Sequence, residues 1–186
     1  MKKLFLYICF LFYIFHFHGI YINAVKEIIM RNNDDNINTL HNIINNNQNG
    51  EGLIINFVDD YYLFDDNVTY RYEISIFYDI TIIGNKNGTT LDFNNGRRGA
   101  FGFRVSKNAG EVITFENIIF KNYKANMLEP GLEMIRVQAT SDKFKLIINN
   151  CTFQNTIYTP IYVESKFNTL DNYDDLRVIF NNCNFM

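Results

Sequence analysis

One short apolar phrase returns four times in this chain at nearly constant spacing. The copies lie at residues 80–84, 113–117, 146–150 and 178–182. Each copy alternates apolar and mixed positions, which is the periodicity of a β-strand. Their last residues are 33, 33 and 32 positions apart. A fixed period of this size is typical of stacked structural units, so it decides the fold before local propensity does.

Two further strand patterns complete each repeat. Three copies of the phrase continue into a second short strand that ends in Phe, at 118–120, 151–153 and 183–185. A third set of apolar–x–apolar strands lies between the repeats, at 103–105, 135–137 and 161–163. Clusters of Asn, Gly, Asp and Lys separate the strands and indicate turns. Three strands per repeat predict a parallel β-helix, whose apolar side chains stack in the lumen with neighbouring strands about 4.8 Å apart.

Two segments match motifs of a known fold family. Residues 80–85 followed by 89–93 match its early "I-T-I-x-G … T-x-L" coil, and 148–153 match its later "I-x-N-C-x-F" coils. The chain thus resembles the amino-terminal portion of the right-handed parallel β-helix proteins, the pectate-lyase-like superfamily. The resemblance covers roughly 53–186 and implies an all-β fold of about four coils. It does not name a function, because one fold hosts many functions.

The asparagines of the repeat are expected to form a structural ladder. Asn117, Asn150 and Asn182 end three copies of the phrase. They fall where the resembled family often has stacked asparagines in its tightest corner. Because buried amides need partners, we expect these side chains to bond from coil to coil inside that corner.

Residues 1–24 are expected to be a signal peptide. A basic start at residues 1–3 precedes an uncharged apolar run over 4–15, and Ala24 offers a small residue for cleavage. Stretching the run to Ile22 gives about 19 residues, the lower end of a membrane-spanning helix, so a membrane anchor is the alternative. We expect a secreted or cell-surface protein that contacts a membrane only if this segment stays uncleaved.

Residues 25–52 are expected to form an amino-terminal cap. Ile37, Leu40, Ile43 and Ile44 recur at helical spacing in a polar stretch, and the polar residues 34–36 precede them. This pattern predicts a short amphipathic helix over 36–46. The first coil of a β-helix has an open lumen, so we expect the helix to lie across it and seal it from water.

The β-helix, 53–186, has no capping segment after its last strand. The final phrase is complete at Phe185 and the sequence stops at Met186. An open stack of strand edges is a template for pairing with another chain. We therefore expect a truncated chain, a fragment of a longer protein, or a protein partner that docks on the open C-terminal coil.

Charge and cysteine content exclude some partners. The net charge is −3 and the pI is near 5.6. Arg97 and Arg98 form the one basic pair after residue 24, so nucleic acid is not an expected partner. Cys151 and Cys183 share a register in adjacent coils and predict a stacked pair of lumenal thiols, with a disulfide as the alternative. No spacing of Cys and His indicates a metal site, and no cofactor is expected.

The acceptor sequons predict exposed turns in a secreted chain. Asn67 and Asn87 are the expected glycosylation sites. A third sequon begins at Asn150, which we expect to be unmodified because it lies at the proposed inner corner.

Three outward positions are candidates for ligand binding. Arg104, Arg136 and Tyr162 occupy the middle of the third strand set. Stacked arginines bind carboxylated sugars bidentately, and a tyrosine ring stacks on a sugar ring. The pattern predicts a groove for an acidic polysaccharide, with an ordinary solvated sheet face as the alternative.

No catalytic residue is assigned. Enzymes of the resembled family need carboxylates to hold calcium, to act as a base or to work as a hydrolytic pair. The acidic candidates do not recur in register on any strand face, namely Asp59 with Asp60, Asp65 with Asp66, and Glu164 with Asp171, Asp174 and Asp175. We therefore expect a secreted, non-catalytic β-helix module with a saccharide-binding or surface-scaffold role. The alternatives are a polysaccharide lyase or glycoside hydrolase, and an inactive truncated remnant.

Overall fold

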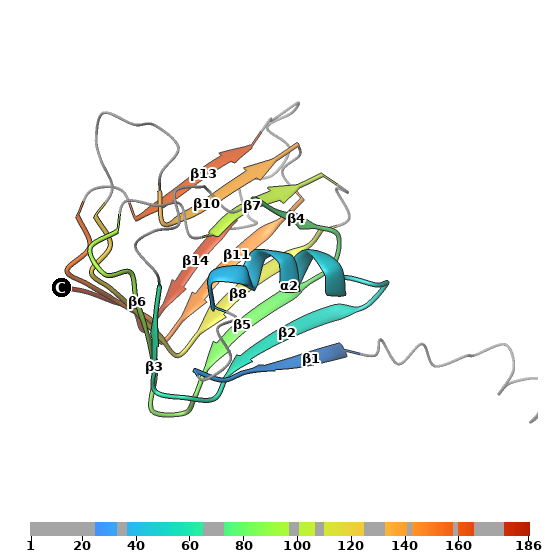
Figure 1. Ribbon diagram of the computed structural model, residues 1–186. Helices are drawn as coiled ribbons and strands as arrows, with labels where there is room; N and C mark the ends of the chain where they lie inside the picture. Colours follow the sequence, from blue (N-terminus) through green and yellow to red (C-terminus); the bar gives the residue numbers. More distant parts are fainter. Residues whose placement is uncertain are drawn as a thin grey trace, which may run out of the picture.

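The computed structural model describes nine stretches of the chain. They are residues 25–32, 37–64, 73–96, 101–106, 110–124, 133–140, 143–157, 160–165 and 177–186. The predicted signal peptide and several predicted site residues lie outside the described residues, namely Asn67, Arg97, Arg98, Asp65, Asp66, Asp171, Asp174 and Asp175. The described part contains fifteen strands, one 3₁₀ helix and one α-helix, and the strands form three parallel sheets (Figure 1).

Sheet A is the largest of the three. In spatial order it contains β1 (Val25–Met30), β2 (Gly52–Phe57), β5 (Ile80–Gly84), β8 (Val112–Glu116), β11 (Lys145–Asn149) and β14 (Val178–Asn181). Sheet B contains β3 (Tyr61–Leu63), β6 (Thr89–Asp92), β9 (Ile118–Lys121), β12 (Thr152–Gln154) and β15 (Asn184–Phe185). Sheet C contains β4 (Glu73–Ile76), β7 (Phe101–Val105), β10 (Ile135–Ala139) and β13 (Ile161–Ser165).

The chain visits the sheets in the order A, B, C and then returns to A. Each turn adds one parallel strand to each sheet, which makes a β-solenoid of about four turns (Figure 1). The repeat of the sequence is therefore the repeat of the structure. Ile113 pairs with Ile80 before it and with Leu146 after it, and Leu146 pairs in turn with Val178. The predicted all-β, parallel, stacked fold is confirmed.

The lumen is filled by the apolar side chains of alternate positions. Ile82, Phe115, Ile148 and Phe180 are aligned partners on successive coils of sheet A. The first three are completely buried, whereas Phe180 on the last coil is 44% exposed. The Phe115 ring lies at the centre, with other rings packed at centroid distances of 5.1, 5.9 and 5.5 Å; they belong to Phe101, Phe103 and Phe120. Burying rings of this size supplies much of the hydrophobic stabilisation of such a core.

Single asparagines turn the chain from sheet A into sheet B. Asn117, Asn150 and Asn182 have φ values of 56°, 51° and 51°, in the left-handed region that asparagine tolerates better than other side chains with a Cβ. Asn182 Nδ2 donates to Asn150 Oδ1 at 3.3 Å. The expectation of a buried ladder is wrong in one respect, because Asn117 is half-buried and the other two are exposed. The amides therefore line the outside of the corner.

A second asparagine corner follows sheet B. Asn122 and Asn155 have φ values of 59° and 52°. Asn155 Nδ2 donates to Asn122 Oδ1 at 2.8 Å, and Asn122 Nδ2 donates to both carboxylate oxygens of Asp92 at 2.9 and 3.0 Å. Asp92 also accepts from the Tyr61 hydroxyl at 3.0 Å. This second ladder was missed, although the spacing N-x-x-F-x-N recurs at 117–122 and 150–155.

Region 25–52 contains both a strand and a helix. β1 pairs with β2 along its whole length and extends sheet A by one strand, which the sequence analysis missed. The predicted helix is present as a 3₁₀ turn, η1 (Ile37–Thr39), continuing into α2 (Leu40–Asn47). Leu40 and Ile44 of α2 are buried in the core cluster, and α2 packs against β4 and β2. Neither helix of the described residues is long and apolar enough to cross a bilayer.

Side-chain amides attach this helix to the edge of sheet C. Asn45 Oδ1 accepts from the Ser75 backbone nitrogen at 2.9 Å, and Asn45 Nδ2 donates to the Glu73 carbonyl at 3.0 Å. Gln48, directly after α2, donates to the Ser75 carbonyl at 2.5 Å and accepts from the Phe77 nitrogen at 2.9 Å. These amides bond backbone groups of β4 and its following turn, in the way that a neighbouring strand would.

The register of sheet C differs from the sequence-based alignment. That alignment placed Arg104 opposite Arg136. In the structure Arg104 pairs with Gln138, and Arg136 pairs with Gly102. A shift of two residues preserves the alternation of faces, so periodicity alone does not detect it. The run F-G-F-R-V of β7 offers two equivalent apolar positions, and the longer alignment of β7 with β10 uses the first of them.

Candidate functional site

The outer face of sheet C presents two columns of outward side chains. Successive residues of a strand point to opposite faces, so every second residue of each strand belongs to this outer surface. One column contains Glu73, Gly102, Arg136 and Tyr162. The other contains Ser75, Arg104, Gln138 and Glu164. Adjacent strands are about 4.8 Å apart, so the four strands span about 14 Å.

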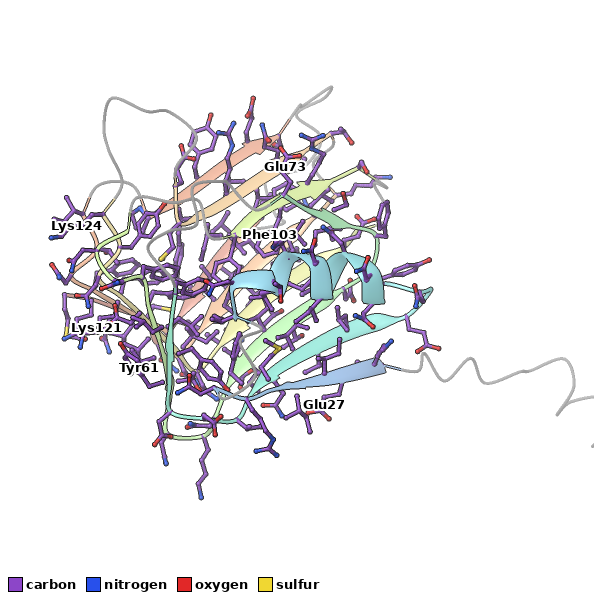
Figure 2. All side chains as sticks on the ribbon, viewed as in Figure 1. Glu27, Tyr61, Glu73, Phe103, Lys121 and Lys124 are labelled. Atoms are coloured by element: carbon purple, nitrogen blue, oxygen red, sulfur yellow. The ribbon has the colours of Figure 1, made fainter. Side chains whose placement is uncertain are left out.

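Arg104 forms an exposed ion pair at one end of this face. Its Nη2 lies 3.0 Å from Glu73 Oε1 on the preceding coil, and the two side chains are 56% and 55% exposed. Figure 2 shows Glu73 on the sheet C side of the molecule, well apart from Tyr61 and Lys121 on sheet B. Because both groups are solvated, this pair contributes little to stability, and its charged atoms remain open to a ligand.

Arg136 occupies the middle of the face and is held on several sides. Its side chain is only 16% exposed. The guanidinium lies 3.4 Å from Glu164 and 3.7 Å from Glu133, and its carbon is 5.1 Å from the centroid of the Tyr162 ring. Gln138 Nε2 donates to the same Glu164 oxygen at 3.2 Å. These contacts fix the orientation of Arg136 beside an aromatic ring that is 40% exposed.

Acidic groups outnumber basic groups among the paired side chains of this face. The two arginines, Arg104 and Arg136, are each paired with carboxylates, and the described carboxylates of Glu73, Glu133 and Glu164 outnumber them. The expected pair of stacked arginines is therefore absent, because the register separates them by two positions and their guanidinium groups already have partners. The structure does bring Arg136 and Tyr162 together, as directly paired residues of β10 and β13.

The two cysteines are free thiols in adjacent coils. Cys151 is buried and Cys183 is half-buried. Cys151 Sγ lies 3.2 Å from the Asn149 carbonyl, and Cys183 Sγ lies 3.2 Å from the Ile148 carbonyl. Burial raises the pKa of the Cys151 thiol to about 12. A neutral, buried thiol is a poor nucleophile and behaves as an apolar filling of the lumen.

Asp59 and Asp60 accept hydrogen bonds from other parts of the chain. Asp59 Oδ2 accepts from the Asn32 backbone nitrogen, and Asp60 Oδ1 accepts from Asn85 Nδ2, each at 2.7 Å. Within the described residues no group of three His, Cys, Asp or Glu side chains is arranged to hold a metal ion. Of the carboxylates that suggested calcium or hydrolytic chemistry, Asp59 and Asp60 thus make structural hydrogen bonds.

The predicted glycosylation site at Asn87 lies in an exposed turn. Its backbone nitrogen donates to Asn85 Oδ1 at 2.8 Å, and Gly88 follows with a φ of 93°. Asn150 of the third sequon is exposed as well, so the expected shielding of that residue is wrong.

Comparison with protein-family models, with curated proteins and with solved structures finds no match for this chain.

Proposed function

We propose that this protein is a secreted or cell-surface β-helix module that binds a saccharide on the outer face of sheet C and does not cleave it. The observation that carries the proposal is the exposed Tyr162 ring, oriented by Arg136 and flanked by Glu164. An aromatic ring gives a sugar ring an apolar surface on which to stack. Carboxylate, amide and guanidinium groups beside it accept and donate the hydrogen bonds of sugar hydroxyls.

The charge pattern favours a neutral saccharide. A polysaccharide with many carboxylates would meet Glu73 and Glu164, which already occupy the guanidinium groups of Arg104 and Arg136. Neutral hydroxyls need no such exchange, because they donate to a carboxylate oxygen that still has a free lone pair. An acidic polysaccharide is therefore the less favoured ligand of the same face.

The finer description of the fold is also a proposal. We infer a right-handed solenoid of the pectate-lyase-like kind, since parallel strand crossovers are right-handed in about 98% of cases and the motifs of the coils match that family. We infer that α2 seals the lumen, because Leu40 and Ile44 are buried in the core cluster while Asn45 and Gln48 bond the edge of sheet C. A crystal structure with left-handed coils, or with α2 detached, would contradict these inferences.

The binding experiment compares two tyrosines of equal exposure. Affinity electrophoresis of the folded protein in gels with a neutral glucan, xylan or mannan, and with polygalacturonate plus calcium, measures retardation and product release. We expect retardation by a neutral polysaccharide and no product. Tyr162→Ala weakens binding roughly two- to tenfold. Tyr61→Ala, which removes a ring that is 41% exposed on sheet B, leaves binding unchanged.

Two outcomes overturn the proposal. Product release that persists in Tyr162→Ala supports the alternative of a lyase or hydrolase. Absence of both binding and product on every polysaccharide leaves the inactive remnant or a purely structural module.

A second candidate role is protein docking through the last coil. Phe180 and Phe185 are 44% and 60% exposed there, and the Phe185 ring stacks on Phe153 at 4.8 Å. We propose a second copy of this chain as the occupant, because two copies that present the same face form the self-complementary contact typical of twofold dimers.

A further inference from the structure

A concavity lies at the corner where the chain passes from sheet C to sheet A. Its volume is about 680 Å³. Three of its lining residues carry carboxylates, namely Glu51, Asp79 and Glu111. Among the described residues that line it there is no lysine, arginine or histidine. It shares no residue with the two outward columns of sheet C, so it is a site separate from the proposed saccharide face.

The repeat itself builds this acidic lining. Glu51, Asp79 and Glu111 each come one residue before a strand of sheet A, and those strands are β2, β5 and β8. Because these three strands are neighbours in sheet A, their preceding corners are stacked as well. Successive corners are about 4.8 Å apart. Relative to the paired residues of the three strands, Glu51 and Glu111 lie two positions earlier and Asp79 one position earlier, so Asp79 is offset by one residue on the middle corner.

Two of the carboxylates have capacity left for a ligand. Asp79 Oδ1 accepts from the Val112 backbone nitrogen at 2.9 Å, and this bond leaves Oδ2 available. Glu51 is exposed and makes no hydrogen bond or ion pair with any described residue. Within the described chain neither carboxylate has a basic partner. Two uncompensated negative charges in one concavity attract cations.

The apolar lining favours an organic cation over a metal ion. Phe77 is 43% exposed, and its turn is fixed because its backbone nitrogen donates to Gln48 Oε1 at 2.9 Å. Val25 and Ile54 also line the concavity. An exposed aromatic ring attracts an ammonium group through its quadrupole, and the aliphatic side chains offer a surface to carbon chains. A bare metal ion would use none of this apolar lining, and it would need more oxygen ligands than the described residues of the corner bring together.

We propose that this acidic corner, defined by Glu51, Phe77 and Asp79, binds a small aliphatic diamine or polyamine. One ammonium group pairs with Glu51 and another with Asp79. The methylene chain between them lies on Phe77 and on the neighbouring Val25 and Ile54. A diamine or polyamine uses both the carboxylates and the apolar surface. A neutral sugar lacks the positive charge, and an inorganic cation lacks the carbon chain.

The test uses probes matched in shape. Isothermal titration of the folded protein compares 1,6-diaminohexane and spermidine with 1,6-hexanediol, which has a similar chain and no charge. We expect binding of the amines and none of the diol. The affinity for the amines should fall between about 20 and about 150 mM salt, because the Debye length shortens from about 20 Å to about 8 Å.

Substitutions distinguish a specific binding site from general electrostatic attraction of the amines. Glu51→Gln and Asp79→Asn should each weaken diamine binding roughly two- to fivefold, as exposed ion pairs do. Phe77→Ala should weaken it to a similar extent. Glu27→Gln removes an exposed carboxylate of β1 that does not line the concavity, and it should leave the affinity unchanged. Gly52→Val should block the site without unfolding the protein, because a Cβ at Gly52 meets its nearest atom at 3.7 Å.

Several results would overturn the proposal. Equal binding of the diol points to an apolar site, and an equal effect of Glu27→Gln points to diffuse charge attraction. Displacement of the diamine by calcium at equal concentration points to a metal site. No amine binding at low salt removes the site altogether, and it leaves the saccharide face untouched because the two regions share no residue.

Discussion

At the scale of single residues, asparagine directs the path of this chain. Every non-glycine residue with a positive φ in the described stretches is an asparagine, and there are seven of them. A short amide side chain tolerates the left-handed region, so asparagine turns the chain at these corners. In two pairs, Asn155 with Asn122 and Asn182 with Asn150, the amides also bond from one coil to the next.

The positions of these asparagines could be predicted better than their environment. The sequence repeat predicts that Asn117, Asn150 and Asn182 share one corner, because a constant spacing aligns equivalent residues of successive coils. Their exposure could not be predicted, since it depends on how far the corner projects from the lumen. The sequence also did not predict that Asp92 accepts hydrogen bonds from the second asparagine ladder. Its partner Asn122 lies 30 residues away in a different coil.

Cys151 provides a prediction at this scale. Burial raises the pKa of its thiol from 9.0 to about 12, so the neutral thiol contributes fully to stability below pH 9, and this contribution is lost as the pH rises toward 12. At pH 9 only about a thousandth of the folded thiol is ionised. Alkylation of Cys151 by iodoacetamide should therefore be roughly a hundredfold or more slower in folded than in urea-unfolded protein.

Mass spectrometry of the alkylated peptides measures both cysteines in one sample. Cys183, which is half-buried, serves as the internal comparison and should react sooner. Equal rates at the two sites would show that the last coils do not shield Cys151.

At the scale of elements, the periodicity of the sequence predicted the helix well but missed one strand and one register. The helix was predicted to within a residue at each end, because four apolar residues on one face leave little choice. β1 was missed because it lies apart from the 33-residue period and its exposed Val25 and Ile29 disturb the alternation. The register of sheet C was wrong by two residues, since a shift of two keeps every side chain on its face.

The amide bonds between α2 and β4 lead to the second prediction. Gln48 is 8% exposed and bonds two backbone groups of the β4 edge. Gln48→Ala leaves those groups without partners and should lower the free energy of unfolding by about 1–3 kcal/mol in urea denaturation. Asn46→Ala, at an exposed position of α2, should change it by less than about 0.5 kcal/mol. Similar effects of the two substitutions would show that the amide contacts are not what holds the helix.

At the scale of the whole molecule, stability is shared between neighbouring coils. In a solenoid each repeat contacts only the repeats beside it, so a coil with a neighbour on one side only is less buried. The aligned column of Ile82, Phe115, Ile148 and Phe180 shows this directly, because burial is complete for three members and partial for the fourth.

Self-association through that coil is the third prediction. Covering Phe180 and Phe185 removes apolar surface from water, which favours a dimer at high protein concentration. Sedimentation velocity across a wide concentration range should show a dimer that Phe185→Ser weakens. Phe77→Ser, which removes an exposed ring at another site, should leave the dimer intact. A monomer at every concentration would exclude this role.

The one-residue asparagine corner between sheets A and B also limits where a peptide could be inserted if this chain were used as a display scaffold. The segment from Asn150 to Asn155 has the same length as its counterpart one coil earlier, and an added residue there would turn the lumenal Phe153 toward solvent. Between successive sheet C partners the spacing instead varies, at 29, 34 and 26 residues. Foreign peptides should therefore be grafted beside sheet C, where the coil already accommodates changes of length without losing its frame.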